Sequence, residues 1–284
     1  MKPSLDALAR EARVDPEHPV LLRERPFLAR WCETLLDPKD PQRARWLRLE
    51  LEQIARNERI AAEVARIAAL DGSRALDVGC QLGALPIALA ARGARVTGLD
   101  VDPALLEAAA LRARCYDAAV EFVRAEGESL PFPDGSFDVV TFVDVIEHVR
   151  DPRAAVRELA RVLRPGGTLY LFGPNRLSPA NLRADPHYQL AGVSVLPESL
   201  GRFYVTRVRG FPRYDVGVLP VGGVVARWLA REGLRVTHSA ADDAEAWWRD
   251  RAPTWLRAAA PAARLWGRAR TSLAPLFHLV AVKV

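Results

Sequence analysis

Three carboxylates surround a short glycine-containing loop in the sequence, and they are the residues best suited to bind a ligand. Asp77 precedes Gly79 and Gly83 in LDVGCQLG, and Asp100 follows about twenty residues later in VTGLD. An acid at that spacing commonly accepts hydrogen bonds from ribose hydroxyls. Carboxylates at Asp77, Asp100 and Glu126 repel a phosphate group. The pattern therefore predicts a cationic ligand that carries hydroxyl and amino groups.

These residues are expected at the ends of strands in an alternating series of elements. Apolar runs predict strands, and apolar residues at three- and four-residue steps predict helices. The predicted strands are 75–78, 95–99, 120–123, 137–143, 168–172, 234–239 and 277–283, and the helices between them are 84–91, 103–114, 152–163 and 222–232. Asp151 is the expected N-cap of the helix at 152–163. The alternation predicts an α/β fold, a doubly wound and mostly parallel seven-stranded sheet with helices on both faces.

Further segments extend this core. Residues 1–70 are expected to form a helical extension ahead of a main domain at 71–284. It is expected to be an irregular lead-in with short helices up to about Pro41 and a helix over 42–70. Residues 173–220 show no clear period. Because so long an irregular stretch is usually functional, a substrate lid is expected there.

A Trp-rich helical insertion is expected at 243–272. A basic amphipathic helix can lie on a membrane, but Pro261 would kink it, which suits a folded cap at least as well. Peripheral membrane contact is therefore not favoured.

Charge and cysteine content narrow the function classes. The net charge is +5 and there are only three lysines, but the arginines are interleaved with acids along the chain, which argues against a nucleic-acid partner. The three cysteines are isolated, so neither a disulfide framework nor a metal site is expected. The N-terminal residues lack the apolar core of a signal peptide. No apolar run approaches bilayer length, and a cytoplasmic location is expected.

Five blocks in order carry a family resemblance: LDVGCQLG, VTGLD, AEGESLPFPDGSFDVV, VIEHVRDP and LRPGGTLYLFGPN, from about Leu76 to Arg176. They resemble the class I S-adenosylmethionine-dependent methyltransferases, close to the small-molecule branch that includes the ubiquinone-biosynthesis O-methyltransferases. The resemblance implies a Rossmann-like sheet and S-adenosyl-L-methionine as the cofactor. It implies that the glycine loop holds the methionine moiety, that Asp77 reaches its amino group and that Asp100 holds both ribose hydroxyls.

The resemblance also extends to neighbouring loops. Glu126 or Gly127 would face the adenine, and Val143 with Asp144 would line the methionyl side. The residues expected to contact the cofactor are Asp77, Gly79, Cys80, Gln81, Gly83, Asp100, Val101, Glu126, Gly127, Val143 and Asp144.

Gln81 departs from the family pattern, which has glycine at this position. One hypothesis is that its side chain points outward, because the position needs a backbone angle that tolerates a side chain more than it needs glycine. The other is that the fold has lost catalysis. Survival of the remaining blocks favours intact binding.

Methyl transfer to a hydroxyl requires a proton acceptor, and histidine suits that role. His148, after the fourth strand, is the leading candidate, although a histidine there can instead hydrogen-bond its own loop. His187 and Tyr188 fall in the expected lid. They are candidates for a base or for substrate contacts, and the alternative is that they only pack within the loop.

The sequence thus predicts transfer of a methyl group to a small-molecule acceptor, with a hydroxyl oxygen favoured and nitrogen or carbon left open. The block of amino-methylating nucleic-acid enzymes, (D/N)PP(Y/F), is replaced by VDVIEH. A non-catalytic cofactor-binding or partner-binding protein is the alternative. An NAD-dependent oxidoreductase is disfavoured, because the third glycine of its loop is missing. The sequence does not predict the oligomeric state.

Overall fold

The computed structural model describes residues 4–15, 17–34, 43–210, 214, 216–217, 219–239 and 276–284. Contacts divide the chain into two compact units, Met1–Glu126 and Gly127–Val284. This division differs from the boundary expected at residue 70, because helix α3 (Arg43–Ile67) packs on helix α4 (Ala84–Ala90) within the first unit. The insertion expected at 243–272 lies outside the described residues.

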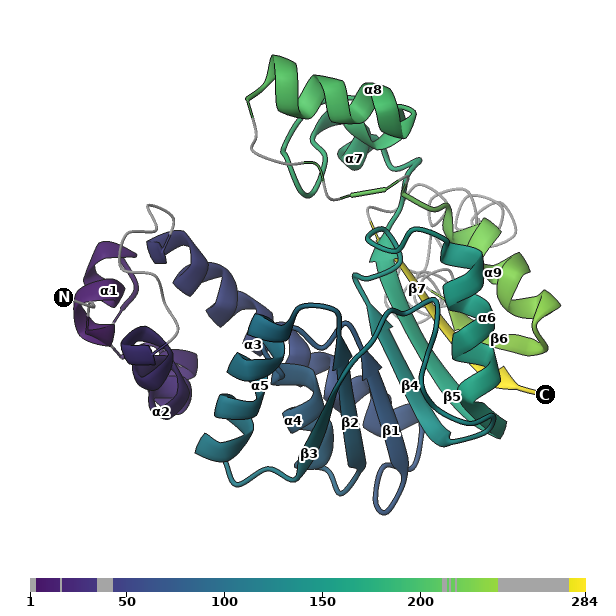
Figure 1. Ribbon diagram of the computed structural model, residues 1–284, viewed down its shortest axis with the longest axis horizontal. Coiled ribbons are helices and arrows are strands. Elements are labelled where there is room, and N and C mark those ends of the chain that lie inside the picture. Colours follow the sequence, from purple (N-terminus) through teal and green to yellow (C-terminus); the bar gives the residue numbers. More distant parts are fainter. Residues whose placement is uncertain are drawn as a thin grey trace, which may run out of the picture. The chain divides into compact units, whose positions relative to one another are not determined.

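The first unit contains three parallel strands in the order β3-β2-β1 (Figure 1). They are β1 (Arg74–Val78), β2 (Arg95–Asp100) and β3 (Val120–Arg124). Helix α5 (Pro103–Cys115) packs on β2 and β3, and α4 packs on all three strands. Asp102 caps α5 by accepting a hydrogen bond from the Ala104 N–H, and Pro103 occupies the first turn. The strands β1, β2 and β3 and the helices α4 and α5 are confirmed within one or two residues of their predicted bounds.

Among the described residues ahead of β1, the chain forms three helices. They are α1 (Leu5–Glu11), α2 (Pro19–Thr34) and the 25-residue α3. Together with Leu111 of α5 they enclose a hydrophobic core that includes Leu8, Phe27 and Leu47. The sequence stretch up to residue 41 is thus more regular than expected, since α2 alone is 16 residues long and contains Pro26. The N-terminal extension is therefore packed against the strand-bearing part of its unit through a shared core.

The second unit contains the remaining strands, β4 (Phe137–Val143), β5 (Leu163–Pro174), β6 (Leu234–Ser239) and β7 (Leu276–Lys283). β4 and β5 are parallel, whereas β7 runs antiparallel to both β5 and β6. Helices α6 (Pro152–Val162) and α9 (Gly222–Arg231) pack on this unit's strands. The strand order β3-β2-β1-β4-β5-β7-β6 gives the seven-stranded, mostly parallel sheet that the sequence predicts.

The start of α6 agrees with the sequence prediction, whereas β5 is longer than predicted. The Asp151 carboxylate accepts hydrogen bonds from the N–H groups of Arg153 and Ala154, which confirms its predicted N-cap role. β5 begins at Leu163, earlier than the strand expected at 168–172, and ends at Pro174. Residue 173, the expected start of the lid, therefore belongs to the strand.

The lid segment is folded rather than irregular. It contains α7 (Pro179–Arg183), the 3₁₀ turn η1 (Val193–Val195), α8 (Glu198–Arg202) and the π-helical turn η2 (Phe203–Val208). Its own hydrophobic cluster includes Tyr188, Val205 and Tyr214, and the Tyr188 and Tyr214 rings stack with centroids 5.5 Å apart. The expectation of an irregular stretch was wrong because helices of three to six residues are too short to establish a hydrophobic period.

Helices of the described chain are all too short or too polar to cross a bilayer.

Candidate functional site

The glycine loop connects β1 to α4 and is tied to the end of β2. The N–H groups of Gly79 and Cys80 both donate to the Leu99 carbonyl, at 2.7 and 2.9 Å. Gly79 and Gly83 have φ angles of 79° and 77°, in the left-handed region that favours glycine. These angles turn the chain sharply at the carboxyl end of β1, as the sequence predicts for a ligand-binding loop.

Asp100 ends β2 and is 7% exposed. Its Oδ2 accepts a hydrogen bond from the Gln81 N–H, and its Oδ1 accepts one from the Asp102 N–H, each at 3.0 Å. A carboxylate oxygen has a second lone pair, so each oxygen retains capacity for a hydroxyl donor. Val101, the next residue, is 55% exposed and offers an apolar surface beside the carboxylate. The pair suits a ribose with an attached aromatic base.

Gln81 takes a left-handed backbone conformation, with a φ angle of 47°. The idea that this position needs a side-chain-tolerant angle more than glycine is therefore wrong, because left-handed geometry costs a non-glycine residue about 1–2 kcal/mol. Its side chain is exposed and thus points outward, as the first hypothesis proposed. The Gln81 N–H bond to Asp100 helps to hold this strained residue in place.

Gly83 allows a close approach between the start of α4 and helix α5. A Cβ added there would lie 2.9 Å from the Ala109 Cβ of α5, and 3.4 Å from the Phe122 ring of β3. Gly83, at the N-terminus of α4, therefore lies directly against Ala109 of α5. Any larger residue would push these two helices apart.

Three other predicted residues of the first unit have contrasting environments. Asp77 is 3% exposed, whereas Glu126 is exposed at the end of the unit. Burial, reinforced by the carboxylates of Asp77 and Asp100, raises the pKa of the Cys80 thiol far above its usual range. Cys80 therefore stays a neutral thiol and is unsuited to nucleophilic chemistry.

In the second unit, Glu147, His148 and His187 lie together. The Glu147 side chain is 1% exposed, and its Oε1 lies 4.0 Å from Nε2 of His148 and 3.7 Å from Nε2 of His187. The two imidazole rings meet edge to face, with centroids 5.2 Å apart. Oε2 of Glu147 and Nδ1 of His187 are buried without a hydrogen-bond partner within the described chain. The structure thus joins two residues that the sequence predicted separately.

His187 is the more buried of the two histidines. Its side chain is 24% exposed, against 39% for His148. Burial by itself lowers the pKa of His187, but Glu147, Asp185 and Asp144 outweigh burial and raise the pKa above its usual value. The exposed ring of His148 is therefore the accessible member of the cluster, and the acids around His187 favour its protonated form.

Other predicted residues of this unit take structural positions. Tyr188 is 8% exposed and belongs to the lid core, where its N–H donates to Oδ1 of Asp185. Val143 ends β4, and Asp144 follows with a φ angle of 53°. The Asp144 N–H continues the strand pairing by donating to the Phe172 carbonyl at 2.9 Å. Strained residues of this kind cluster at ligand sites.

Sequence reasoning missed Glu147 and Asp185. Glu147 could have been noted as an acid between apolar residues in VIEHV, whereas nothing local marks Asp185. The absence of a metal was expected from cysteine spacing, but Glu147, His148 and His187 each offer one ligand atom, and these atoms lie within 4.8 Å of one another. The sequence could not show this set, because His187 reaches the cluster from the folded lid.

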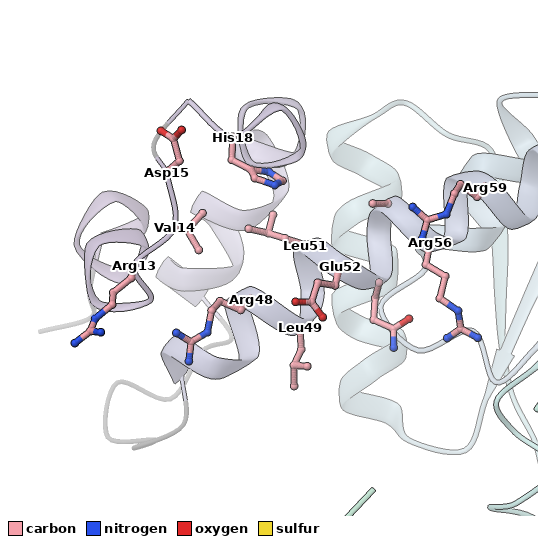
Figure 2. Close-up of a pocket in the computed structure, with 12 residues that line it drawn as sticks. Arg13, Val14, Asp15, His18, Arg48, Leu49, Leu51, Glu52, Arg56 and Arg59 are labelled. Carbon is pink, nitrogen blue, oxygen red and sulfur yellow. The ribbon is translucent and has the colours of Figure 1, made fainter. Parts of the chain in front are cut away.

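A separate groove of about 680 Å³ lies among the N-terminal helices and is lined by Arg13, Val14, Asp15, His18, Arg48, Leu49, Leu51, Glu52, Gln53, Ala55, Arg56 and Arg59. None of these is a predicted site residue. In Figure 2 the guanidinium groups of Arg13, Arg48 and Arg56 end at separate places. Arg48 donates to the Ala12 carbonyl at 3.1 Å. The groove therefore does not gather its positive charge around one point.

Comparisons with known proteins bear on this geometry. Residues 76–171 match the methyltransferase domain family. A ubiquinone biosynthesis O-methyltransferase of Xanthomonas campestris is 43% identical over 118 residues, which are 41% of this chain and 49% of that protein. A ubiquinone biosynthesis O-methyltransferase of Xanthomonas oryzae is 36% identical over 170 residues, which are 59% of this chain and 64% of that protein. The matches thus span only about half to two thirds of these relatives.

The fold has solved counterparts. An S-adenosylmethionine-dependent methyltransferase from Mesorhizobium loti has a TM-score of 0.52 and 20% identity, covering 75% of this chain and 92% of that chain. At this identity the likeness establishes the fold alone. The matched segment contains Asp77, the glycine loop, Asp100 and the Glu147–His148 pair. Residues 76–171 therefore form a methyltransferase domain.

Proposed function

We propose that this protein transfers a methyl group from S-adenosyl-L-methionine to a hydroxyl oxygen of a small molecule. The observation that carries the proposal is the Asp100 carboxylate, which the glycine loop holds with free acceptor capacity beside the exposed Val101. The methyltransferase domain supports the reaction class. The choice of oxygen is supported by the relatives named as O-methyltransferases.

The glycine loop and the residues around it would bind the cofactor. S-adenosyl-L-methionine supplies a methyl carbon already activated by a sulfonium. Asp100 would accept hydrogen bonds from the ribose hydroxyls, and Val101 would contact the adenine. Asp77 would bind the amino group of the methionine moiety. Gly127 would face the adenine, and Val143 with Asp144 would line the methionyl side.

His148 would accept the proton of the acceptor hydroxyl. Its ring is the exposed one of the cluster, and the buried Glu147 carboxylate lies 4.0 Å from its Nε2. A carboxylate at this distance stabilises the imidazolium that forms when the proton is transferred. His187 shares the same carboxylate and comes from the lid, where it can contact the acceptor.

The direct test is turnover on a panel of phenols, sugars and lipid-like alcohols. Turnover is measured as the rate at which S-adenosylhomocysteine is released. His148→Ala should abolish most turnover and leave S-adenosylhomocysteine affinity unchanged, because the variant keeps the glycine loop and Asp100. His238→Ala is the matched control, since His238 lies in β6 and should leave turnover unchanged. Equal activity of His148→Ala and wild type would remove His148 from the mechanism.

Two further measurements separate other functions of the same residues. Cofactor binding without turnover on any acceptor would favour the non-catalytic alternative. A chelator added to the wild-type assay tests whether Glu147, His148 and His187 act as metal ligands. Loss of activity, with recovery on adding a divalent ion, would replace the proton-acceptor role by a metal role.

A further inference from the structure

Arg112 is the largest fully buried side chain of the described residues. It lies on α5 and its side chain is 1% exposed. Its Nε and Nη2 both donate to Oε2 of Glu24, at 3.2 and 2.9 Å, and its Nη1 donates to Oε1 of Glu50 at 2.9 Å. The guanidinium also lies over the Phe27 ring, 4.6 Å from its centroid. An acid from α2 and an acid from α3 thus fix one cation on α5.

The same guanidinium reaches the glycine loop. Nη1 of Arg112 donates to the carbonyl oxygen of Leu82 at 3.2 Å. Leu82 stands between Gln81 and Gly83, and both of these have left-handed φ angles, of 47° and 77°. A strained backbone of this kind persists only where its surroundings hold it. The Leu82 carbonyl is therefore held from one side by Arg112, while the Gln81 N–H is held from the other by Asp100.

The number of acids points to positioning rather than to neutralisation. One carboxylate would balance the charge of Arg112, yet Glu24 and Glu50 both bind it, from different helices. Tyr116 adds a hydrogen bond from its hydroxyl to Oε2 of Glu24 at 2.9 Å. The planar guanidinium fork is thereby fixed in orientation, which a point charge such as lysine could not reproduce.

We propose that Arg112 is a positioning residue for the cofactor loop, and that Glu24 and Glu50 on the N-terminal helices act on the cofactor through it. The inference rests on the proposed function, because it takes the loop at 79–83 to be the cofactor loop. It gives the N-terminal extension a defined role, since α2 and α3 orient the guanidinium and the guanidinium in turn holds the Leu82 carbonyl.

The binding test compares variants by calorimetric titration with S-adenosylhomocysteine. Arg112→Lys should weaken binding at least tenfold, because an ammonium group cannot reach both acids and the Leu82 carbonyl together. Glu50→Ala should weaken it at least threefold, whereas Glu50→Gln, which retains an acceptor oxygen for Nη1, should stay within twofold of wild type. Leu8→Ala is the control: Leu8 is fully buried in the same core and has no polar group, so it should lower stability and keep affinity within twofold.

A second readout needs no cofactor. The Gly83 N–H donates to the Cys80 carbonyl inside the loop, at 2.9 Å. Its hydrogen exchange, relative to that of Val78 in β1, should quicken at least tenfold in Arg112→Lys and Glu50→Ala. In Leu8→Ala the exchange rates of the Gly83 and Val78 amides should rise together, because this substitution lowers the stability of the whole unit. If Arg112→Lys fails to fold, S-adenosylhomocysteine affinity and hydrogen exchange at Gly83 are measured on Glu50→Ala and Glu50→Gln instead.

The outcomes separate the two proposals. Failure of wild type to bind S-adenosylhomocysteine, together with the expected exchange pattern, would end the proposed function and leave Arg112 as the residue that orders the loop. Normal binding by wild type, Arg112→Lys and Glu50→Ala, with unchanged relative exchange at Gly83, would overturn the positioning role. Equal loss of affinity in Leu8→Ala and Arg112→Lys would also overturn it, because affinity would then follow stability alone.

Discussion

Replacement of Asp100 should affect both cofactor affinity and the stability of the loop, by amounts that the geometry sets. The carboxylate accepts two backbone hydrogen bonds, one at each oxygen and each at 3.0 Å. Hydrogen bonds to a charged group contribute about 1.5–3 kcal/mol each. Asp100→Ala removes both, so the free energy of unfolding should fall by about 3 kcal/mol or more. Asp100→Asn keeps one acceptor oxygen and should lose about half as much.

Cofactor affinity gives the second magnitude. Each ribose hydroxyl bond to Asp100 contributes about 1.5–3 kcal/mol, so loss of even one weakens binding roughly ten- to 150-fold in Asp100→Ala. Titration with S-adenosylhomocysteine measures this, and urea unfolding measures stability. Asp102→Ala is the matched control, because Asp102 only caps α5 through Ala104 and should cost about 1 kcal/mol of stability without changing affinity. A folded Asp100→Ala protein with wild-type affinity would refute the ribose assignment.

Three further substitutions test other parts of the structure. Gln81→Gly should raise the free energy of unfolding by about 0.5–1 kcal/mol, because relief of left-handed strain exceeds the added unfolded-state entropy; lower stability in urea would contradict this. Burial raises the pKa of Glu50 despite Arg112, so stability from its neutral form is lost as pH rises, and Glu50→Gln should gain stability relative to wild type in urea unfolding as the pH is raised. The raised pKa of His187 contributes stability that is complete below pH 6.5 and is lost as pH rises through the folded-state pKa. The free energy of unfolding of wild type should therefore exceed that of Glu147→Gln most clearly below pH 6.5. Unfolding titrations at several pH values measure this, and a difference that grew at high pH would contradict the role given to His187.

The alternating elements could be predicted because each one carries a local signal. Pro103 after Asp102, and Pro152 after Asp151, mark helix starts by the same cap chemistry that the structure shows. Asp100 could be placed at a strand end because the strand before it is a buried apolar run. The local pattern therefore sufficed where burial, capping and turn chemistry act within a few residues.

The features that escaped prediction depend on contacts between distant segments. Arg112 looks like an ordinary helix arginine in the sequence, and its burial follows only from Glu24 and Glu50 on other helices. The lid helices are stabilised by a cluster that joins Tyr188 to Tyr214 rather than by an amphipathic period. The angle at Gln81 reflects anchoring of the loop to Asp100, which no neighbouring residue signals.

The position of β7 has a consequence for the order of assembly during synthesis. β7 follows β6 in the chain but lies between β5 and β6, pairing Leu171 with Leu279 on one side and Val236 with Ala281 on the other. β5 must therefore wait with one edge open until residues 276–283 have left the ribosome. An open strand edge is a template for aggregation, so slow translation or premature termination before this segment should yield insoluble protein.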